Sequence, residues 1–180
     1  MLGERHLDLL TGAAQFTEDL VPADSLCAVI LRAPVGHGWI TTLDLSAARA
    51  APGVRAVYAA DDLAAGGVKP MRSRAPVTGD DGQPMREPGR PVLATDSVKY
   101  LGQPIALVVA DSQATAEDAR DLIDLSIDEA PVIKDAEAAA AEGAPQLWPT
   151  VPGNQSFIWR AGTPDAVATA MADAAHVVTL

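Results

Sequence analysis

The stretch Pro104-Ile-Ala-Leu-Val-Val-Ala110, followed by Ser112 and an amphipathic segment, carries the clearest folding information in this 180-residue sequence. A continuous apolar run bounded by turn residues is typical of a buried strand. Ser112 is a favourable N-cap for a helix that runs to about Ile123, with the apolar positions 116, 119 and 123 on one face. The two segments together predict a buried strand covered by a helix.

Shorter elements of the same kinds are expected on both sides of this unit. Strands are predicted over residues 26–32, 39–44, 54–59 and 125–128, and short helices over 47–51, 136–142 and 164–173. Alternation in the strand at 54–59 predicts Val54, Ala56 and Tyr58 on one face. The order β-β-α-β, loop, β-α-β-α indicates an α+β or α/β fold built from two small halves of similar plan.

The end of the sequence suggests that the chain continues in a longer protein. A helix capped by Thr163 is followed by His176-Val-Val-Thr-Leu180, which predicts the beginning of a strand. This strand would have no following turn and no partner.

Residues 69–90 are expected to form a long polar loop. The stretch contains five Lys or Arg residues, four prolines and three glycines. Proline removes backbone donors and glycine adds backbone freedom, so no regular element should cross it. We expect this loop to be exposed, partly mobile and the first target of limited proteolysis. A second Pro/Gly cluster at 143–153 predicts a domain over residues 1–145 and a linker with a further short segment over 146–180.

Composition excludes several classes of protein. The formal net charge is −11, from 24 acidic and 13 basic residues, which disfavours nucleic-acid binding. No apolar run approaches the ~20 residues of a membrane span, and the charged first residues do not resemble a signal peptide. The single cysteine, Cys27, excludes a disulfide framework within the chain. These features predict a cytoplasmic protein.

The sequence contains no recognisable catalytic, cofactor-binding or metal-ligating motif. Nucleotide-binding, zinc-protease and nucleophile-elbow motifs are all missing from the sequence, and the three histidines are widely spaced. His37 would be a candidate general base, but a polar residue in a turn between two glycines is the favoured interpretation. Cys27 is interpreted as a core residue, and the Asp61-Asp62 pair as a cap of the turn over Leu63 to Ala65.

Several strings resemble, in order, the large subunit of molybdenum hydroxylases, the family of xanthine dehydrogenase, aldehyde oxidase and aerobic carbon monoxide dehydrogenase. The strings are Leu10–Asp19, Leu31–Ile40, Ala50–Val57, Asp61–Leu63, Val92–Ala106, Ala116–Ala119, Ile127–Asp135, Gly143–Pro145 and Asn154. The most characteristic is Tyr100-Leu-Gly-Gln-Pro104, which is similar to the family's Tyr-x-Gly-(Glu or Gln)-Pro segment. The tail from Gly162 to Leu180 resembles the start of the family's molybdenum-cofactor domain.

This resemblance implies an N-terminal α/β-hammerhead domain of α+β class with two β-β-α-like halves. It implies a parent oxidoreductase that uses molybdopterin, with iron–sulfur clusters and FAD on partner subunits or domains. The downstream molybdenum-cofactor domain and the iron–sulfur and FAD subunits are then the expected partners. The family's cofactor ligands lie further along the chain, so this part alone is expected to be inactive. The substrate, whether an aldehyde, an N-heterocycle or carbon monoxide, stays open.

Two turns are candidate functional surfaces. The first is a docking face at Tyr100, Gly102, Gln103 and Pro104, where glycine permits close approach and the Gln103 amide offers donors and an acceptor to a partner. An ordinary tight turn, with Gln103 on the surface, is the equal alternative.

The second is a possible substrate-access turn at Pro34, Gly36 and His37. The Gly36-His37-Gly38 sequence replaces a more alanine-rich turn of the family, and Cys27 stands where the family often has a histidine.

Two other functions remain open: a stand-alone binding or assembly module, and a small acidic enzyme with its own site at His37.

Overall fold

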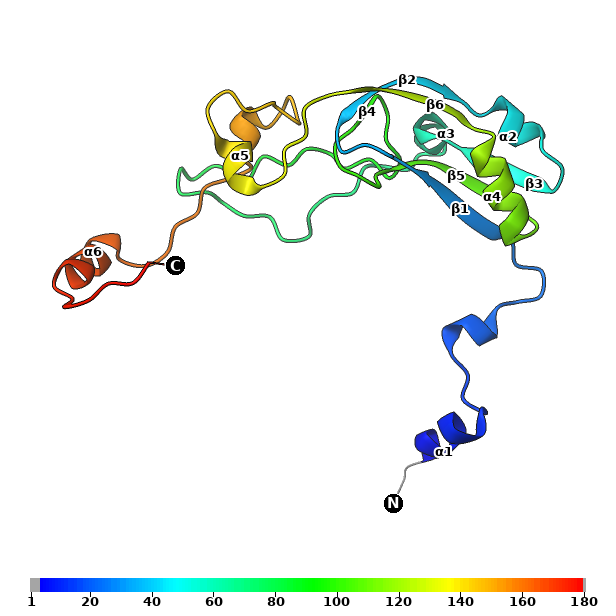
Figure 1. The fold of residues 1–180 in the computed structure, drawn as a ribbon, viewed down its shortest axis with the longest axis horizontal. Helices are drawn as coiled ribbons and strands as arrows, with labels where there is room; N and C mark the ends of the chain where they lie inside the picture. Colours follow the sequence, from blue (N-terminus) through cyan, green and yellow to red (C-terminus); the bar gives the residue numbers. More distant parts are fainter. Residues whose placement is uncertain (1–3, 180) are drawn as a thin grey trace. The chain divides into compact units, whose positions relative to one another are not determined.

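The computed structural model describes residues 4–179 and confirms the α+β class, with two three-stranded antiparallel sheets (Figure 1). The strand orders are β1-β5-β3 and β4-β2-β6. The elements, in chain order, are α1 (Glu4–Thr11), η1 (Thr17–Leu20), β1 (Cys27–Arg32), β2 (Gly38–Asp44), α2 (Ser46–Ala50), β3 (Val54–Tyr58), α3 (Ala60–Ala65), β4 (Ser97–Val98), β5 (Pro104–Ala110), α4 (Gln113–Asp121), β6 (Asp124–Glu129), α5 (Ala136–Ala140), η2 (Pro152–Asn154) and α6 (Pro164–Ala172).

Contacts within the chain define two compact units. The first contains the residues up to Lys69 together with Pro91–Pro131, and the second contains Pro70–Arg90 and the residues from Val132 onward. Both sheets belong to the first unit. This division differs from the expected domains 1–145 and 146–180, which stay a prediction.

β5 is the central strand of the larger core, as its sequence indicated. It pairs with β1 on one side and with β3 on the other. α4 covers this sheet with Ala116 and Ala119, both at most 1% exposed, and the Ser112 hydroxyl caps the helix by accepting a hydrogen bond from the Thr115 backbone N at 3.1 Å. The predicted strand-and-helix unit is therefore confirmed.

β3 places its side chains on different faces from those expected. Val57 is 4% exposed and belongs to the core, whereas Tyr58 is 39% exposed. The register with β5 shifts between Val54 and Ala56, which inserts one residue into the ladder. Because strand side chains alternate, a slip of one residue exchanges the two faces, so the predicted Val54, Ala56 and Tyr58 face is wrong.

The second sheet closes over a smaller core. Four buried residues form it, namely Ala33, Ala94, Val98 and Ile105. Leu31 of β1 and Leu43 of β2 pack against both cores. The two sheets therefore share apolar side chains and make one unit.

Several elements differ from expectation. α1, η1, α3, β4 and η2 were not predicted. His176–Thr179 contain no strand, while Leu180 lies outside the described residues. The predicted helix at 164–173 is confirmed as α6, although Thr163 makes no side-chain cap bond. A strand needs a neighbour to satisfy its backbone groups, and none lies beside His176–Thr179 in the part of the chain that the structure describes.

Residues 70–90, all of which the structure describes, contain no helix or strand and no buried residue, as predicted. They are nevertheless tied to a distant segment. Asp80 N donates to Ile158 O at 2.8 Å, and Arg86 N donates to Ser156 O at 2.9 Å. The sequence did not indicate this pairing, because it uses backbone groups that every residue carries.

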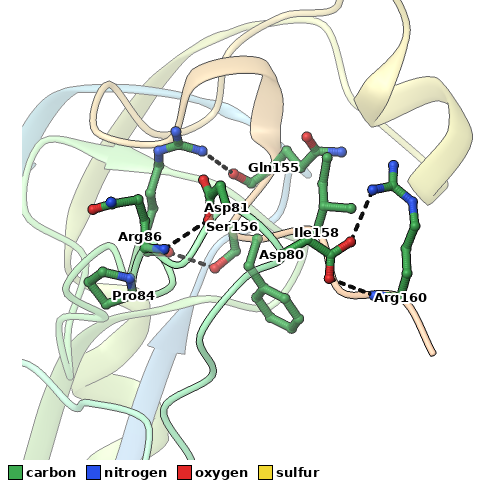
Figure 2. Close-up of a pocket in the computed structure, with 10 residues that line it drawn as sticks. Asp80, Asp81, Pro84, Arg86, Gln155, Ser156, Ile158 and Arg160 are labelled. Carbon is green, nitrogen blue, oxygen red and sulfur yellow. Dashed lines mark hydrogen bonds and ion pairs between the residues drawn. The ribbon is translucent and has the colours of Figure 1, made fainter.

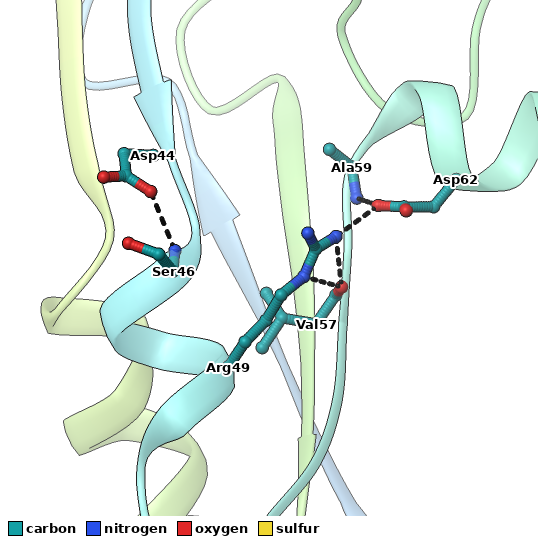
Figure 3. A network of polar contacts seen from close by, with 6 residues as sticks. All are labelled: Asp44, Ser46, Arg49, Val57, Ala59 and Asp62. Carbon is teal, nitrogen blue, oxygen red and sulfur yellow. Dashed lines mark hydrogen bonds and ion pairs between the residues drawn. The ribbon is translucent and has the colours of Figure 1, made fainter.

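A polar network holds α2, β3 and α3 together (Figure 3). Arg49 donates to the Val57 carbonyl from Nε and Nη2, at 3.2 and 3.1 Å, and forms an ion pair with Asp62 at 2.8 Å. The same Asp62 carboxylate accepts a hydrogen bond from Ala59 N at 2.8 Å. Asp62 therefore acts as a cap, as expected, but of the helix α3 that starts at Ala60 and not of a turn over Leu63 to Ala65.

Gly38 provides a test of the second sheet. A Cβ at this position would lie 2.6 Å from the Asp128 carbonyl oxygen and 2.6 Å from the Ile127 Cγ2 atom. We expect Gly38→Ala to lower the free energy of unfolding by about 2 kcal/mol or more, because β2 and β6 must separate. Chemical denaturation measures this. Gly66→Ala is the matched control, since its nearest atoms are at 3.4 Å and its φ is −75°, and a comparable loss in both variants would contradict the argument.

Candidate functional site

The structure brings the two candidate turns side by side. Ala33 N donates to Gln103 O at 2.9 Å, and Gly102 N donates to Ala33 O at 2.9 Å. The strand pairing that leads into this contact joins Arg32 to Pro104. We call residues 33–37 and 99–103 the paired turns. The sequence proposed each turn separately and gave no sign that they meet.

Gln103 is a buried residue whose side chain forms a hydrogen bond within its own turn. It is 4% exposed, and its Oε1 atom accepts a hydrogen bond from the Lys99 backbone N at 2.7 Å. Its own backbone N donates to Tyr100 O at 3.2 Å. The side chain therefore closes the turn from Lys99 to Gln103. The expected tight turn is confirmed, whereas two expectations for the Gln103 side chain are wrong: that it lies on the surface, and that its amide oxygen is left for a partner.

The backbone conformation at position 102 favours glycine. Its φ is +78°, which side chains of L-residues rarely adopt. Apart from its two chain neighbours, no described residue has an atom within 4 Å of the position that a Cβ would occupy. Close approach within the chain is therefore not the reason for glycine at this position.

The solvent-facing part of the paired turns is apolar. Tyr100 is 55% exposed and Leu101 is 70% exposed. Arg32 lies beside them, because its Nη1 atom donates to the Gly102 carbonyl at 3.0 Å. Leu101 was not singled out in the sequence, where an apolar residue in a turn carries no marker of exposure.

His37 is buried, with 7% of its surface exposed. Its Nδ1 atom lies 2.9 Å from the Pro131 carbonyl oxygen, and since a carbonyl only accepts, Nδ1 carries the proton in this contact. The His37 carbonyl accepts a hydrogen bond from Ala130 N at 3.0 Å. These bonds attach the turn to the chain after β6. Pro34 is exposed and Gly36 is half-buried, so Pro34 faces the solvent in the possible access turn.

A chain of polar side chains runs along β4. Asp96 accepts hydrogen bonds from the Thr95 and Ser97 hydroxyls at 3.0 and 3.2 Å, and Lys99 Nζ donates to Ser97 Oγ at 2.8 Å. The Thr95 hydrogen bond is the main cause that lowers the pKa of Asp96, and burial opposes it. Burial lowers the pKa of Lys99, whose Nζ lies 5.7 Å from the centre of the Trp39 ring, while the Asp96 charge opposes that shift.

The second unit has a shallow hollow of about 380 Å³ (Figure 2). It lies between the two segments that pair through Asp80 and Arg86. Asp80 accepts from Arg160 Nη1 at 3.0 Å, and Arg86 Nη1 donates to the Gln155 carbonyl at 3.4 Å. Two of the charged groups in this hollow thus neutralise each other.

Comparison with known proteins identifies the fold. A family model described as "Aldehyde oxidase and xanthine dehydrogenase, a/b hammerhead domain" matches residues 11–131. The chain belongs to this family. The match includes both sheets and both paired turns, and it confirms the resemblance and the hammerhead fold inferred from the sequence.

Relatives of this hammerhead domain carry the names of hydroxylases, dehydrogenases and oxidoreductases. The nicotine 6-hydroxylase large subunit of Paenarthrobacter nicotinovorans is 35% identical over 174 residues, covering 95% of this chain and 20% of the relative. The xanthine dehydrogenase molybdenum-binding subunit of Escherichia coli O157:H7 is 33% identical over 135 residues, covering 75% and 17%. The solved quinoline 2-oxidoreductase of Pseudomonas putida 86 has a TM-score of 0.71 and 31% identity, covering 82% and 18%. The chain thus spans a fifth or less of the length of these relatives.

The side chains that could ligate a metal are dispersed in the described part of the chain. Among residues 4–179, no three His, Cys, Asp or Glu side chains come together as a possible metal site. The buried polar groups of the paired turns are used in internal hydrogen bonds. No helix in the described part of the chain has the length and apolar character needed to cross a membrane.

The burial of Gln103 leads to a stability prediction. We expect Gln103→Ala to lower the free energy of unfolding by about 1–3 kcal/mol, because the Lys99 N–H loses its acceptor and a cavity remains. Chemical denaturation measures the loss. Gln83→Ala is the control, since Gln83 is exposed. An effect of Gln103→Ala as small as that of the control would contradict the supporting role.

Asp96 leads to a prediction for pH. Its pKa in the folded state lies below the ordinary value, so its contribution to stability is present above about pH 4. That contribution is lost as the pH falls through the lowered pKa. We expect wild type to be more stable than Asp96→Asn near pH 6, and the difference to shrink below pH 4. Thermal unfolding across pH 2–7 measures it, and a difference that is constant over this range would contradict the assignment.

Proposed function

We propose that this chain is the hammerhead part of a molybdenum-dependent hydroxylase or dehydrogenase large subunit, with a structural and docking role. The match of residues 11–131 to the family's hammerhead domain carries the proposal. The relatives' names support it, since they are hydroxylase and dehydrogenase large or molybdenum-binding subunits. In this proposal the molybdopterin cofactor belongs to a separate domain, and iron–sulfur clusters and FAD belong to partner subunits or domains in the cytoplasm.

The paired turns are the proposed docking face. Their backbone groups and the Gln103 side chain bond within the chain, so a partner would contact the side chains that remain exposed. Tyr100 and Leu101 offer the largest apolar area there, and Pro34 lies on the neighbouring turn. Gly102 and Gln103 then act by shaping the turn, and Pro104 begins the strand that anchors it.

His37 supports this structural role. Its protonated nitrogen is engaged with a backbone carbonyl, and among the described residues no ion pair includes it. A general base needs a nitrogen within reach of substrate, whereas His37 is buried. The interpretation of His37 as the centre of a separate small enzyme is therefore not favoured.

The proposal assigns neither the cofactor nor catalysis to this chain, and this can be tested. We expect the purified chain to contain no stoichiometric molybdenum or pterin and to reduce no dye with an aldehyde, a purine or carbon monoxide. Metal analysis by mass spectrometry and dye-reduction assays measure this. Stoichiometric molybdenum in the purified chain would overturn the proposed division of roles.

The docking role has its own test in a full-length large subunit that carries this domain. We expect the double variant Tyr100→Ser, Leu101→Ser to reduce molybdenum content and activity, because the hammerhead domain would no longer seat against the rest of the subunit. The same variant of the 180-residue chain should unfold at the wild-type temperature, since both side chains are exposed. Leu122→Ser, at a side chain that is 49% exposed, is the control. Wild-type activity and molybdenum content in the double variant would reject the docking face.

A further inference from the structure

Residues 155–160, here called the exit segment, begin at a point that is fixed by Asn154. Among the described residues other than glycine, Asn154 alone has a positive φ, +54°. Asparagine adopts this left-handed conformation more readily than most residues. Its Oδ1 atom accepts a hydrogen bond from Leu147 N at 2.9 Å, and its Nδ2 atom donates to the carbonyl oxygens of Ala139 and Pro145 at 3.0 and 2.9 Å. These bonds determine where the exit segment starts.

Residues 70–90, here called the arm, fold back on themselves. Met71 and Arg90 form an antiparallel bridge, in which Met71 N donates to Arg90 O at 2.8 Å. Nearer the tip of the arm, Gly79 N donates to Gln83 O at 2.9 Å. The arm therefore has a defined backbone path, although it contains no helix or strand.

The arm holds the exit segment at two places (Figure 2). Arg86 N donates to Ser156 O at 2.9 Å, and Ser156 Oγ donates to Arg86 O at 2.6 Å. Further along, Asp80 N donates to Ile158 O at 2.8 Å, and the Asp80 carboxylate accepts hydrogen bonds from Arg160 N at 2.9 Å and Arg160 Nη1 at 3.0 Å. An ion pair to an exposed guanidinium contributes little by itself, so the bonds to the backbone set the alignment.

The contacts of the chain change in kind after Arg160. Residues 161–179 are all exposed. α6 is bonded within itself, since Val167 N donates to Thr163 O at 3.1 Å and Thr169 Oγ1 donates to the Asp165 carbonyl at 2.9 Å. Residues 161–163, which separate Arg160 from the start of α6, contain no helix or strand. The free chain between the exit segment and α6 is therefore three residues long.

We propose that Asp80 fixes the exit of the chain from the second unit by holding residues 157–160 against the arm. Without its carboxylate, the free chain before α6 grows from the three residues 161–163 to the seven residues 157–163. The r.m.s. end-to-end distance of a flexible chain then rises from about 10 Å to about 15 Å, and the effective concentration of the part that follows falls about 3.5-fold. This role rests on the proposed function, in which the molybdenum-cofactor domain follows this chain and has to stay close to it.

Hydrogen exchange of the 180-residue chain, followed by NMR, tests the contact at Arg160. We expect the Arg160 amide to be protected in the wild type and to exchange about tenfold faster in Asp80→Ala, because it loses a charged acceptor. Asp80→Asn keeps an oxygen acceptor and should stay within about twofold of the wild type, since the exposed ion pair adds little. Asp81→Ala is the matched control, because the exposed Asp81 carboxylate accepts its hydrogen bond from Gln83 N within the arm.

Distances between spin labels test the reach of α6. Nitroxide labels on Glu142→Cys and Asp173→Cys, both exposed positions, are placed in a Cys27→Ala background of the same chain. Double electron–electron resonance then gives the spread of distances between them. We expect Asp80→Ala to broaden this spread about 1.5-fold, because the r.m.s. distance grows as the square root of the number of free residues. A Gly-Ser-Gly-Ser insertion after Gly162 adds the same length of free chain and should broaden it equally.

Two results would overturn the proposal. One is an unprotected Arg160 amide in the wild type. The other is an Asp80→Ala variant that matches Asp81→Ala in amide exchange and in the spread of distances. Neither measurement needs the cofactor domain, so both decide on the exit segment independently of the proposed function.

Discussion

The burial of β5 between β1 and β3 is the constraint on which the rest of the first unit depends. Ile105, Ala106, Val108 and Ala110 have no exposed surface, and they contact both cores. A strand buried on both faces must satisfy its backbone through two neighbours and leave no polar side chain inside. That requirement determines where β1 and β3 lie, and α4 covers the resulting sheet.

The paired turns follow from this arrangement. β1 ends where β5 begins, so the turn after one strand and the turn before the other meet at the same end of the pair. Polar groups in this region, including the Gln103 amide and the His37 ring, form internal hydrogen bonds that fix the conformation of the turns. What remains for a partner is the apolar surface of Tyr100 and Leu101. Exposed aromatic and aliphatic side chains of this kind are typical of interfaces, which is why we propose a docking role for this surface.

The exposed paired turns present side chains on a frame of internal hydrogen bonds, which is the basis of the proposed docking face. Arg32 contributes to that frame, because its guanidinium donates to the Gly102 carbonyl.

Local sequence was sufficient to predict the buried strand and the capped helix from 104 to 123, because apolar runs and N-caps act over a few residues. It did not predict the short strand β4, which has only two residues. It was also sufficient for the family, since the matching strings follow one another along the chain. It was not sufficient for the faces of β3, where a bulge against β5 moved Val57 inward and Tyr58 outward. Nor did it show that Gln103 and His37 are buried, because burial depends on neighbours brought from distant parts of the chain, here β6 and the second turn. Composition and short-range pattern specify elements, whereas strand register and long-range packing assign each side chain to the core or to a surface.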